Sequence, residues 1–522
     1  MSDTLLSSAD GSTGDRRDAA LIVALVLFAL FFRLATLMIM NTGVDERDYW
    51  FSAKALASGL PYPDVTHRTT RFAIILPVAL TQLILGSHPD VYYVTPVANS
   101  MLQAALLYLL GRRLRGRLAG FLAALGLTLF PYMIRAGSQV RPEVFSLTYV
   151  LAVLLFFLEY LTRDSREMGP LLWTAGFLFI AYEAKITNMY LAPGMFVAIL
   201  LYKRKPSHAF LFAGLLAGLF LAETGVYAAV TPYKLGELQI IAVNHFHPDS
   251  VTVPSVGSLF QRYASPYLQF YWQLPFVLFG LAAAWYLVTG RDRRLSSLVL
   301  LSLSFFLCLT FEVKSLHPVT PAESFINRYF AAVLPPVFLV LACAVQEVVT
   351  RIVPRAHRRT AETSLPYIGV LVLGAIAILG VFSLPRLPAG LRAYANSPLK
   401  PRQHPLVLNE RYRRIINSAY ADDTPLVAAE GIAGDNAMET ARYFFLDLAF
   451  YRNGQPPAIA RLESAGTSYL MVAPLHGAPP FDRMLATVRA PFRVLPIRAS
   501  GLRLLTGDSV DGKTGPVDQD DQ

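Results

Sequence analysis

An acidic pair, Asp45 and Glu46, stands shortly after the first long apolar stretch of the chain, residues 21–40. Carboxylates at the end of a membrane helix are costly to keep there without a partner or a function. A partly desolvated carboxylate near other charges suits a general base, because its surroundings tune its pKa. Asp45 is therefore the first candidate for a catalytic base, and Glu46 is the second. A plainer interpretation is that Asp45 caps the following helix by accepting backbone N–H bonds.

A second charged group, Arg135, Arg141 and Glu143, lies at the corner between two later apolar stretches. Basic residues usually gather on the cytoplasmic side of a membrane, so arginines on the opposite side call for an anionic partner. Pro142 is expected in the first turn of the next helix, which puts Glu143 in that turn as well. Glu143 is the third catalytic candidate, although a glutamate there would also stabilise the helix dipole.

Further cations fall on the same predicted face from distant parts of the chain. Arginine suits phosphate because its planar guanidinium donates two charge-assisted hydrogen bonds. Each cation alone is more simply a headgroup anchor or an ion-pair partner. Together with the acidic pair, they predict one anionic ligand held beside a base. The predicted substrate-binding residues are His67, Arg68, Arg71, Arg135, Arg141, Lys185, Arg328 and Tyr329.

This combination of groups fits sugar transfer from a polyprenyl phosphate. Phosphate is already a good leaving group, so it needs cations to stabilise its developing charge and no protonating acid. The acceptor hydroxyl needs one carboxylate to take its proton, as in an inverting sugar transfer. The lipid tail of such a donor explains why the site would be built into a membrane protein.

The composition indicates a membrane protein. The 522 residues are 54% hydrophobic and 16% charged, whereas a soluble domain carries about 25% charged residues. The net charge of +10 comes from short basic clusters between apolar runs, which favours a topology signal over nucleic-acid binding. Cys308 and Cys343 both lie in apolar runs, which argues against a disulfide framework and a cysteine metal site. The first apolar run lacks a small-residue cleavage site and predicts an uncleaved helix.

The apolar stretches predict a mainly α-helical, polytopic protein with about eleven transmembrane helices. A crossing needs about 20 residues, and the fifth and sixth spans fit that length least well. Basic clusters follow the second, fourth, sixth, eighth and tenth spans, so all of them share one side and the N-terminus is predicted to be cytoplasmic. The predicted spans are residues 21–40, 91–110, 118–134, 144–161, 171–184, 189–202, 209–230, 268–288, 295–311, 330–349 and 367–384.

The remaining segments complete the predicted domain organisation. The first external loop is expected to hold an interfacial helix at residues 45–58 and an interfacial or partly re-entrant helix at 72–85, which is too short for a crossing. A small extracytoplasmic α/β domain is predicted to contain strands at 425–429 and 468–472 and a helix at 436–450. The predicted regions are a disordered cytoplasmic N-terminus (1–20), a transmembrane catalytic domain (21–384), the α/β domain (385–505) and a disordered tail (506–522).

No cofactor is predicted. Asp45, Glu46, Asp48 and the pair His245 and His247 offer oxygen and nitrogen ligands for a divalent cation, but their spacing matches no clear motif. A solvated loop explains the histidines more simply.

The chain resembles the GT-C superfamily of membrane glycosyltransferases, and is similar to bacterial protein O-mannosyltransferases and lipid A aminoarabinose transferases. The resemblance covers about residues 21–349. It is carried by Asp45-Glu46, by the segment from Arg135 to Glu143, and by Arg328-Tyr329 with Pro335-Pro336. It implies that Asp45 is the catalytic carboxylate of an inverting transfer from a polyprenyl-phosphate sugar. It also implies that Arg71 lies where such enzymes keep a basic residue near the donor phosphate. Aminoarabinose transferases usually have a lysine followed by prolines there, whereas Phe72 follows Arg71 here.

The predicted function is therefore glycosyl transfer on the extracytoplasmic face of the inner membrane. The expected partners are membrane lipids, a polyprenyl-phosphate sugar and an acceptor hydroxyl on lipopolysaccharide, a cell-wall glycan or a secreted protein; nucleic acid is not expected. One alternative is a transporter or flippase of a lipid-linked or anionic solute, whose charges would line a substrate path. Another is a non-catalytic assembly protein. Charges gathered on one face and a soluble C-terminal segment favour the enzyme.

Overall fold

The structure is a computed structural model of the chain. Most of the residues that it describes lie between positions 11 and 352. Within that range the fold is almost entirely helical. Beyond residue 352 the structure describes the backbone of four short strands. The gaps within 11–352 are residues 38–43, 60–61, 64, 88, 164–167, 238, 241–258, 260–269, 291, 317–318 and 322–326.

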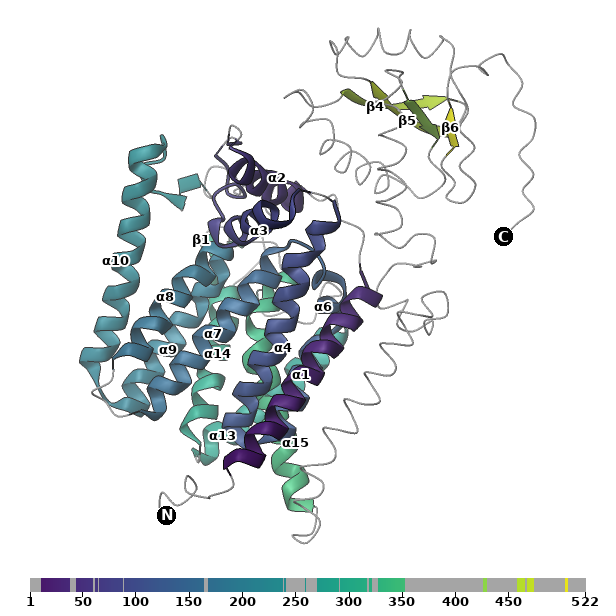
Figure 1. The fold of residues 1–522 in the computed structure, drawn as a ribbon. Coiled ribbons are helices and arrows are strands. Elements are labelled where there is room, and N and C mark those ends of the chain that lie inside the picture. The colour runs from purple at the N-terminus through teal and green to yellow at the C-terminus, as the bar shows by residue number, and fades with distance from the viewer. Residues whose placement is uncertain are drawn as a thin grey trace.

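The helices run back and forth along a common direction, with the start of α1 at the bottom of Figure 1 and α2 and α3 at the top. The helices of the bundle are α1 (Gly11–Ala35), α4 (Val94–Arg115), α5 (Arg117–Thr128), α7 (Pro142–Thr162), α8 (Gly169–Ala184), α9 (Ala192–Ala198), α10 (Pro206–Val230), α13 (Phe270–Thr289), α14 (Arg293–Phe311) and α15 (Leu334–Ile352). The elements at the upper end and the connections are α2 (Val44–Ser58), α3 (Phe72–Leu85), η1 (Pro89–Tyr93), α6 (Pro131–Ala136), η2 (Ile186–Leu191), η3 (Ile199–Lys203), β1 (Val313–Leu316), β2 (Val319–Pro321) and η5 (Asn327–Val333).

Eight segments in the described residues are long and apolar enough to cross a membrane. They match the first, second, fourth and sixth to tenth predicted spans. The third predicted span is α5 followed by the short α6, and the fifth is α8, with 16 residues. The eleventh, 367–384, lies outside the described residues. The mainly α-helical, polytopic fold is thus confirmed, while the count of eleven stays a prediction.

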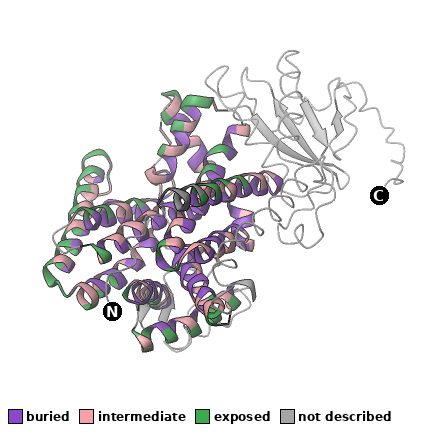
Figure 2. Cartoon of the chain, turned by 60° about the horizontal axis from the view of Figure 1, so that its bottom comes forward, coloured by how far each residue is buried: buried purple, intermediate pink, exposed green. Residues whose placement is uncertain are grey.

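The helices of the bundle differ in how far they are buried: the inner helices are mostly covered, and the outer ones are mostly exposed. α7 is the most buried of the described candidate spans. α4 and α5 approach each other closely, because a Cβ placed on Gly111 would lie 2.6 Å from the Cα of Gly120; small residues serve this purpose between membrane helices. The outer helices α10 and α13 expose apolar side chains such as Leu221 (73%) and Val288 (86%), and exposed residues lie on the outside of the bundle in Figure 2. Such surfaces suit contact with lipid.

Basic residues gather at the lower end of the bundle, as predicted for one membrane side. Asp18 is buried at the start of α1 and pairs with Arg112 (2.6 Å) and Arg117 (2.8 Å). Arg115 lies 3.5 Å from Asp292, which precedes α14. The assignment of this end to the cytoplasm stays a prediction from the positive-inside rule.

In the C-terminal part, four strands form an antiparallel sheet in the order β4-β5-β3-β6. They are β3 (Leu426–Ala429), β4 (Ala458–Ser464), β5 (Thr467–Ala473) and β6 (Arg503–Leu505). β3 and β5 match the two predicted strands. The predicted helix, 436–450, lies outside the described residues, so an α/β domain stays a prediction.

Candidate active site

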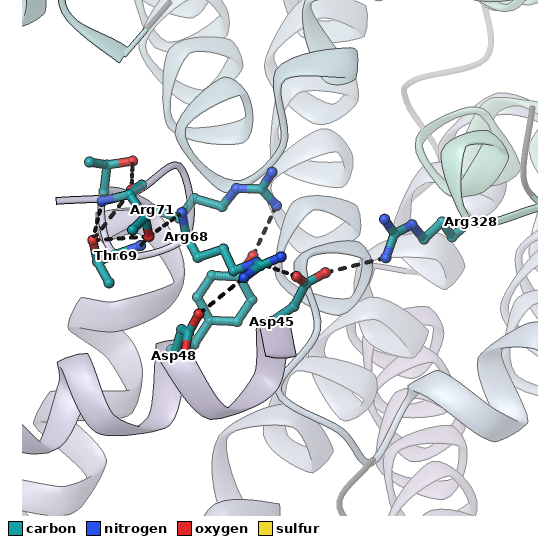
Figure 3. Close-up of polar contacts among 9 residues, drawn as sticks. Asp45, Asp48, Arg68, Thr69, Arg71 and Arg328 are labelled. Atoms are coloured by element: carbon teal, nitrogen blue, oxygen red, sulfur yellow. Dashed lines mark hydrogen bonds and ion pairs between the residues drawn. The ribbon is translucent and has the colours of Figure 1, made fainter. Parts of the chain in front are cut away.

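Asp45 lies between two arginines that come from distant parts of the chain. Its Oδ1 is 2.6 Å from Nε of Arg68, and its Oδ2 is 3.2 Å from a terminal guanidinium nitrogen of Arg328. Figure 3 shows the carboxylate bridging the two guanidinium groups. The Asp45 side chain keeps 29% exposure. The carboxylate is therefore neutralised but still reachable.

The positions of Asp45 and Arg68 follow from local structure. Asp45 and Asp48 are three residues apart at the start of α2, so they share one helix face and both contact Arg68, Asp48 at 3.4 Å. Arg68 lies in the α2–α3 loop, in a turn where the Thr66 hydroxyl accepts backbone N–H bonds from Arg68 and Thr69 at 3.3 Å. The Tyr62 hydroxyl donates to the Thr69 carbonyl at 2.6 Å and holds the loop together.

Glu46 belongs to a separate, buried network. Being next to Asp45 on a helix, it points to another face and is 2% exposed. It accepts hydrogen bonds from the Tyr92 hydroxyl (2.6 Å) and from Nε of Arg141 (2.7 Å). The Tyr92 oxygen in turn accepts the backbone N–H of Val140 at 2.9 Å. These bonds tie α2 to the corner before α7 and occupy both Glu46 oxygens.

Glu143 pairs with Lys185 beneath Arg328. Pro142 and Glu143 open α7, as predicted, and Glu143 is 3% exposed. The Lys185 ammonium donates to Glu143 (2.7 Å) and to the backbone carbonyl of Arg328 (2.8 Å). Lys185 also lies over the Tyr329 ring, 4.8 Å from its centroid. This pair fixes the segment that carries Arg328 and leaves Glu143 little access to a substrate.

Three further predicted binding residues, Arg71, His67 and Arg135, have different surroundings. Arg71 donates to the Tyr49 hydroxyl at 3.0 Å, above Asp45 in Figure 3. His67 is buried in the same loop, 6% exposed. Arg135 lies on α6 and is partly exposed, and within the described chain it forms no ion pair with the clustered carboxylates.

The electrostatics of the site favour a bound anion. Burial alone would raise the pKa of Asp45, but the charges of Arg328, Arg68 and Arg71 outweigh it and hold that pKa below its usual value. Five cations (Arg68, Arg71, Arg141, Lys185 and Arg328) face the four carboxylates Asp45, Glu46, Asp48 and Glu143. Among these nine residues the cations therefore outnumber the carboxylates by one, beside a carboxylate that stays ionised at neutral pH.

Sequence reasoning missed two members of this site, Tyr49 and Tyr92, and named Asp48 only as a possible cation ligand. Tyr49 and Tyr92 hold Arg71 and Glu46, and Asp48 holds Arg68. A tyrosine near a membrane span is usually an interface residue, so nothing in the sequence marks these two. Of the possible cation ligands named from the sequence, Asp45 and Glu46 pair with arginines, and His245 and His247 lie outside the described residues.

The comparisons with known proteins support the resemblance to GT-C membrane glycosyltransferases that the sequence indicated. The structure of ArnT from Cupriavidus metallidurans in the apo state aligns with a TM-score of 0.53 and 14% identity, covering 96% of this chain and 98% of that chain. The same protein bound to undecaprenyl phosphate aligns with a TM-score of 0.54 and 13% identity, covering 97% and 99%.

The chain also matches one family model and one further solved structure. Residues 74–227 match the family described as dolichyl-phosphate-mannose-protein mannosyltransferase. The archaeal oligosaccharyltransferase AglB from Archaeoglobus fulgidus, in complex with an inhibitory peptide and a dolichol-phosphate, aligns over 78% of this chain and 58% of that chain, with 12% identity and a TM-score of 0.45. No curated protein sequence matches the chain. The chain is an integral, multi-pass membrane protein by its apolar helices and its fold.

Proposed function

We propose that the chain is an inverting glycosyltransferase that moves a sugar from a polyprenyl phosphate to an acceptor hydroxyl on the extracytoplasmic face. The observation that carries this proposal is the Asp45 carboxylate held between Arg68 and Arg328 at one end of a membrane bundle. A carboxylate suited to act as a base and cations suited to bind phosphate lie side by side there, as the reaction requires. The family match and the undecaprenyl phosphate bound by the structurally similar ArnT support the donor class.

Asp45 is proposed to act as the base. It takes the proton of the acceptor hydroxyl while that oxygen attacks the anomeric carbon of the sugar. The bond from that carbon to the phosphate oxygen breaks, and the electron pair leaves with the phosphate. Glu46 and Glu143 hold the scaffold instead, since both are buried and paired with Arg141 and Lys185.

Arg68 and Arg328 are proposed to bind the phosphate. A phosphate at this place competes with Asp45 for both guanidinium groups, because arginine pairs with either anion. Donor binding would thus draw positive charge away from Asp45 and raise the pKa of its carboxylate. Asp45 would therefore be a stronger base when the donor is present than when it is absent. As the phosphate leaves, the same cations stabilise its second negative charge.

The prenyl chain has a candidate path on the bundle. An apolar cavity of about 740 Å³ lies among α8, η2, α9, α10 and α14. Its lining includes Ile186, which directly follows Lys185, together with Met189, Phe196 and Phe212. A lipid tail lying there would have its phosphate near Lys185, at the end of the bundle that carries the Asp45 site.

The test is sugar transfer by the purified protein in lipid. Polyprenyl-phosphate sugars carrying different hexoses and pentoses are offered with lipopolysaccharide, glycan and peptide acceptors. The proposal expects one donor to yield glycosylated acceptor and free polyprenyl phosphate in equal amounts. Movement of labelled lipid across the bilayer without any transfer would instead identify a flippase.

A further inference from the structure

Three glutamates meet outside the Asp45 site. Glu183 lies near the end of α8, Glu223 on α10 and Glu237 in the segment after α10, and one carboxylate oxygen of each lies within 4.8 Å of the others. Glu237 is 3% exposed, and the other two are partly buried. Each glutamate has one buried oxygen without a hydrogen-bond partner in the described part of the chain. Carboxylates this close repel each other, so the group calls for a positive partner.

A buried hydroxyl provides a second, independent sign of a ligand. Tyr182 is 2% exposed, and its hydroxyl has no hydrogen-bond partner among the described residues. It lies within electrostatic range of all three glutamates. Buried polar groups are nearly always satisfied, so the unpaired hydroxyl and the three unpaired carboxylate oxygens together point to a bound species.

The chain itself supplies little positive charge here. Arg71 acts on Glu237 from a distance, but its guanidinium is hydrogen-bonded to Tyr49. Among the described ion pairs none involves the three glutamates. Three carboxylates therefore remain without a close cation.

We propose that Glu183, Glu223 and Glu237 bind a hard divalent cation, Ca²⁺ or Mg²⁺. The donor set consists of oxygens alone, which suits these ions better than zinc or copper. Calcium–oxygen distances are about 2.3–2.6 Å, so oxygens on opposite sides of one ion lie about 5 Å apart. The spacing of the three carboxylates fits a single ion of that size without rearrangement of the helices.

The proposed cation joins elements that also carry the Asp45 site. The turn presenting Glu237 is fixed by Gly236, whose φ of +66° suits glycine and where a Cβ would lie 3.1 Å from the Cα of Thr224. Tyr227 on α10 donates to the carbonyl of Thr70, next to Arg71, at 3.2 Å. A cation would neutralise the charge of Glu237 and so remove the electrostatic attraction between Glu237 and Arg71.

The test measures cation binding without any sugar substrate, so its result does not depend on the proposed activity. The full chain in lipid nanodiscs is treated with EDTA, transferred to chelator-free buffer and titrated with Ca²⁺ or Mg²⁺ while heat of binding and Tm are recorded. We expect saturable binding and a rise in Tm for the wild type. Glu237→Gln should weaken binding by at least about 10-fold.

Two controls make the result decisive. Glu159→Gln, which alters a carboxylate paired with Arg163 at the other end of the bundle, should bind like the wild type. In EDTA, Glu237→Gln should melt no lower than the wild type, because it removes one repelling charge. Absence of binding by the wild type, or equal binding by Glu237→Gln, would overturn the proposal.

Discussion

Two groups of carboxylates lie at the same end of the bundle and are built in opposite ways. Asp45, Glu46 and Glu143 each contact an arginine or lysine within 3.2 Å. The group of Glu183, Glu223 and Glu237 has no such partner among the described residues. The first arrangement has spare positive charge and suits an anion, whereas the second has spare negative charge and suits a cation. The role of an acidic residue near a membrane face therefore depends on which charged side chains contact it.

Removing a cation from the first group should produce the largest effect on stability. Lys185→Met leaves Glu143 buried without its partner, so the free energy of unfolding should fall by about 3–5 kcal/mol. Unfolding in mixed micelles measures the change. Lys205→Met, which alters an exposed lysine at the other end, should leave stability unchanged. Equal stability of the two variants would show that the Glu143–Lys185 pair does not hold the site.

Removing the bridging arginine should act on catalysis. Arg328→Ala takes away a group that we propose to stabilise the leaving phosphate, so kcat should fall by about 100- to 1,000-fold. Single-turnover sugar transfer measures the step directly. The control is Arg351→Ala, in the last turn of α15 and far from η5, which carries Arg328. Similar rates for both variants would remove Arg328 from the proposed mechanism.

Neutralising one carboxylate in each group should change stability in opposite directions. Glu46→Gln disturbs a buried ion pair with Arg141 and should cost about 3 kcal/mol. Glu223→Gln, measured in EDTA at a pH at which the three glutamates are ionised, should stabilise by roughly 1 kcal/mol because it relieves repulsion between like charges. Both values come from unfolding in the same micelles. Loss of stability in both variants would contradict the distinction between the two groups.

The pH dependence of transfer should separate the free enzyme from the donor complex. The arginines hold the pKa of Asp45 below its usual value in the free enzyme, so kcat/KM should fall only in strong acid, where the base becomes protonated. Donor phosphate is proposed to draw Arg68 and Arg328 away and raise that pKa. The acid limb of kcat should therefore lie at higher pH than that of kcat/KM. Coincident limbs would show that the donor leaves Asp45 unchanged.

The sequence predicted the first group better than the second for a physical reason. Asp45, Arg68, Glu143, Lys185 and Arg328 all stand at ends of apolar stretches on one predicted face, and charge placement at span ends is visible in a sequence. Their pairing was not predictable, because Arg328 and Asp45 are separated by 283 positions.

The acidic group was not predictable at all. Glu183 and Glu223 each look like a single polar residue near a helix end, and Glu237 looks like part of a loop. Only the packing of α8 beside α10, and the tight turn at Gly236, bring them together. Three isolated residues leave no motif, whereas Asp45 and Glu46 are adjacent.

The central claim is that Asp45 is the base between phosphate-binding arginines, and Asp45→Asn tests it most directly. The variant keeps the size of the side chain and is partly exposed, so folding should be retained. Sugar transfer and polyprenyl phosphate binding are measured on the same preparation. We predict that transfer falls by about 100- to 10,000-fold, while polyprenyl phosphate binds at least as tightly because Arg68 and Arg328 lose a competing anion. Transfer at the wild-type rate by folded Asp45→Asn would contradict the account.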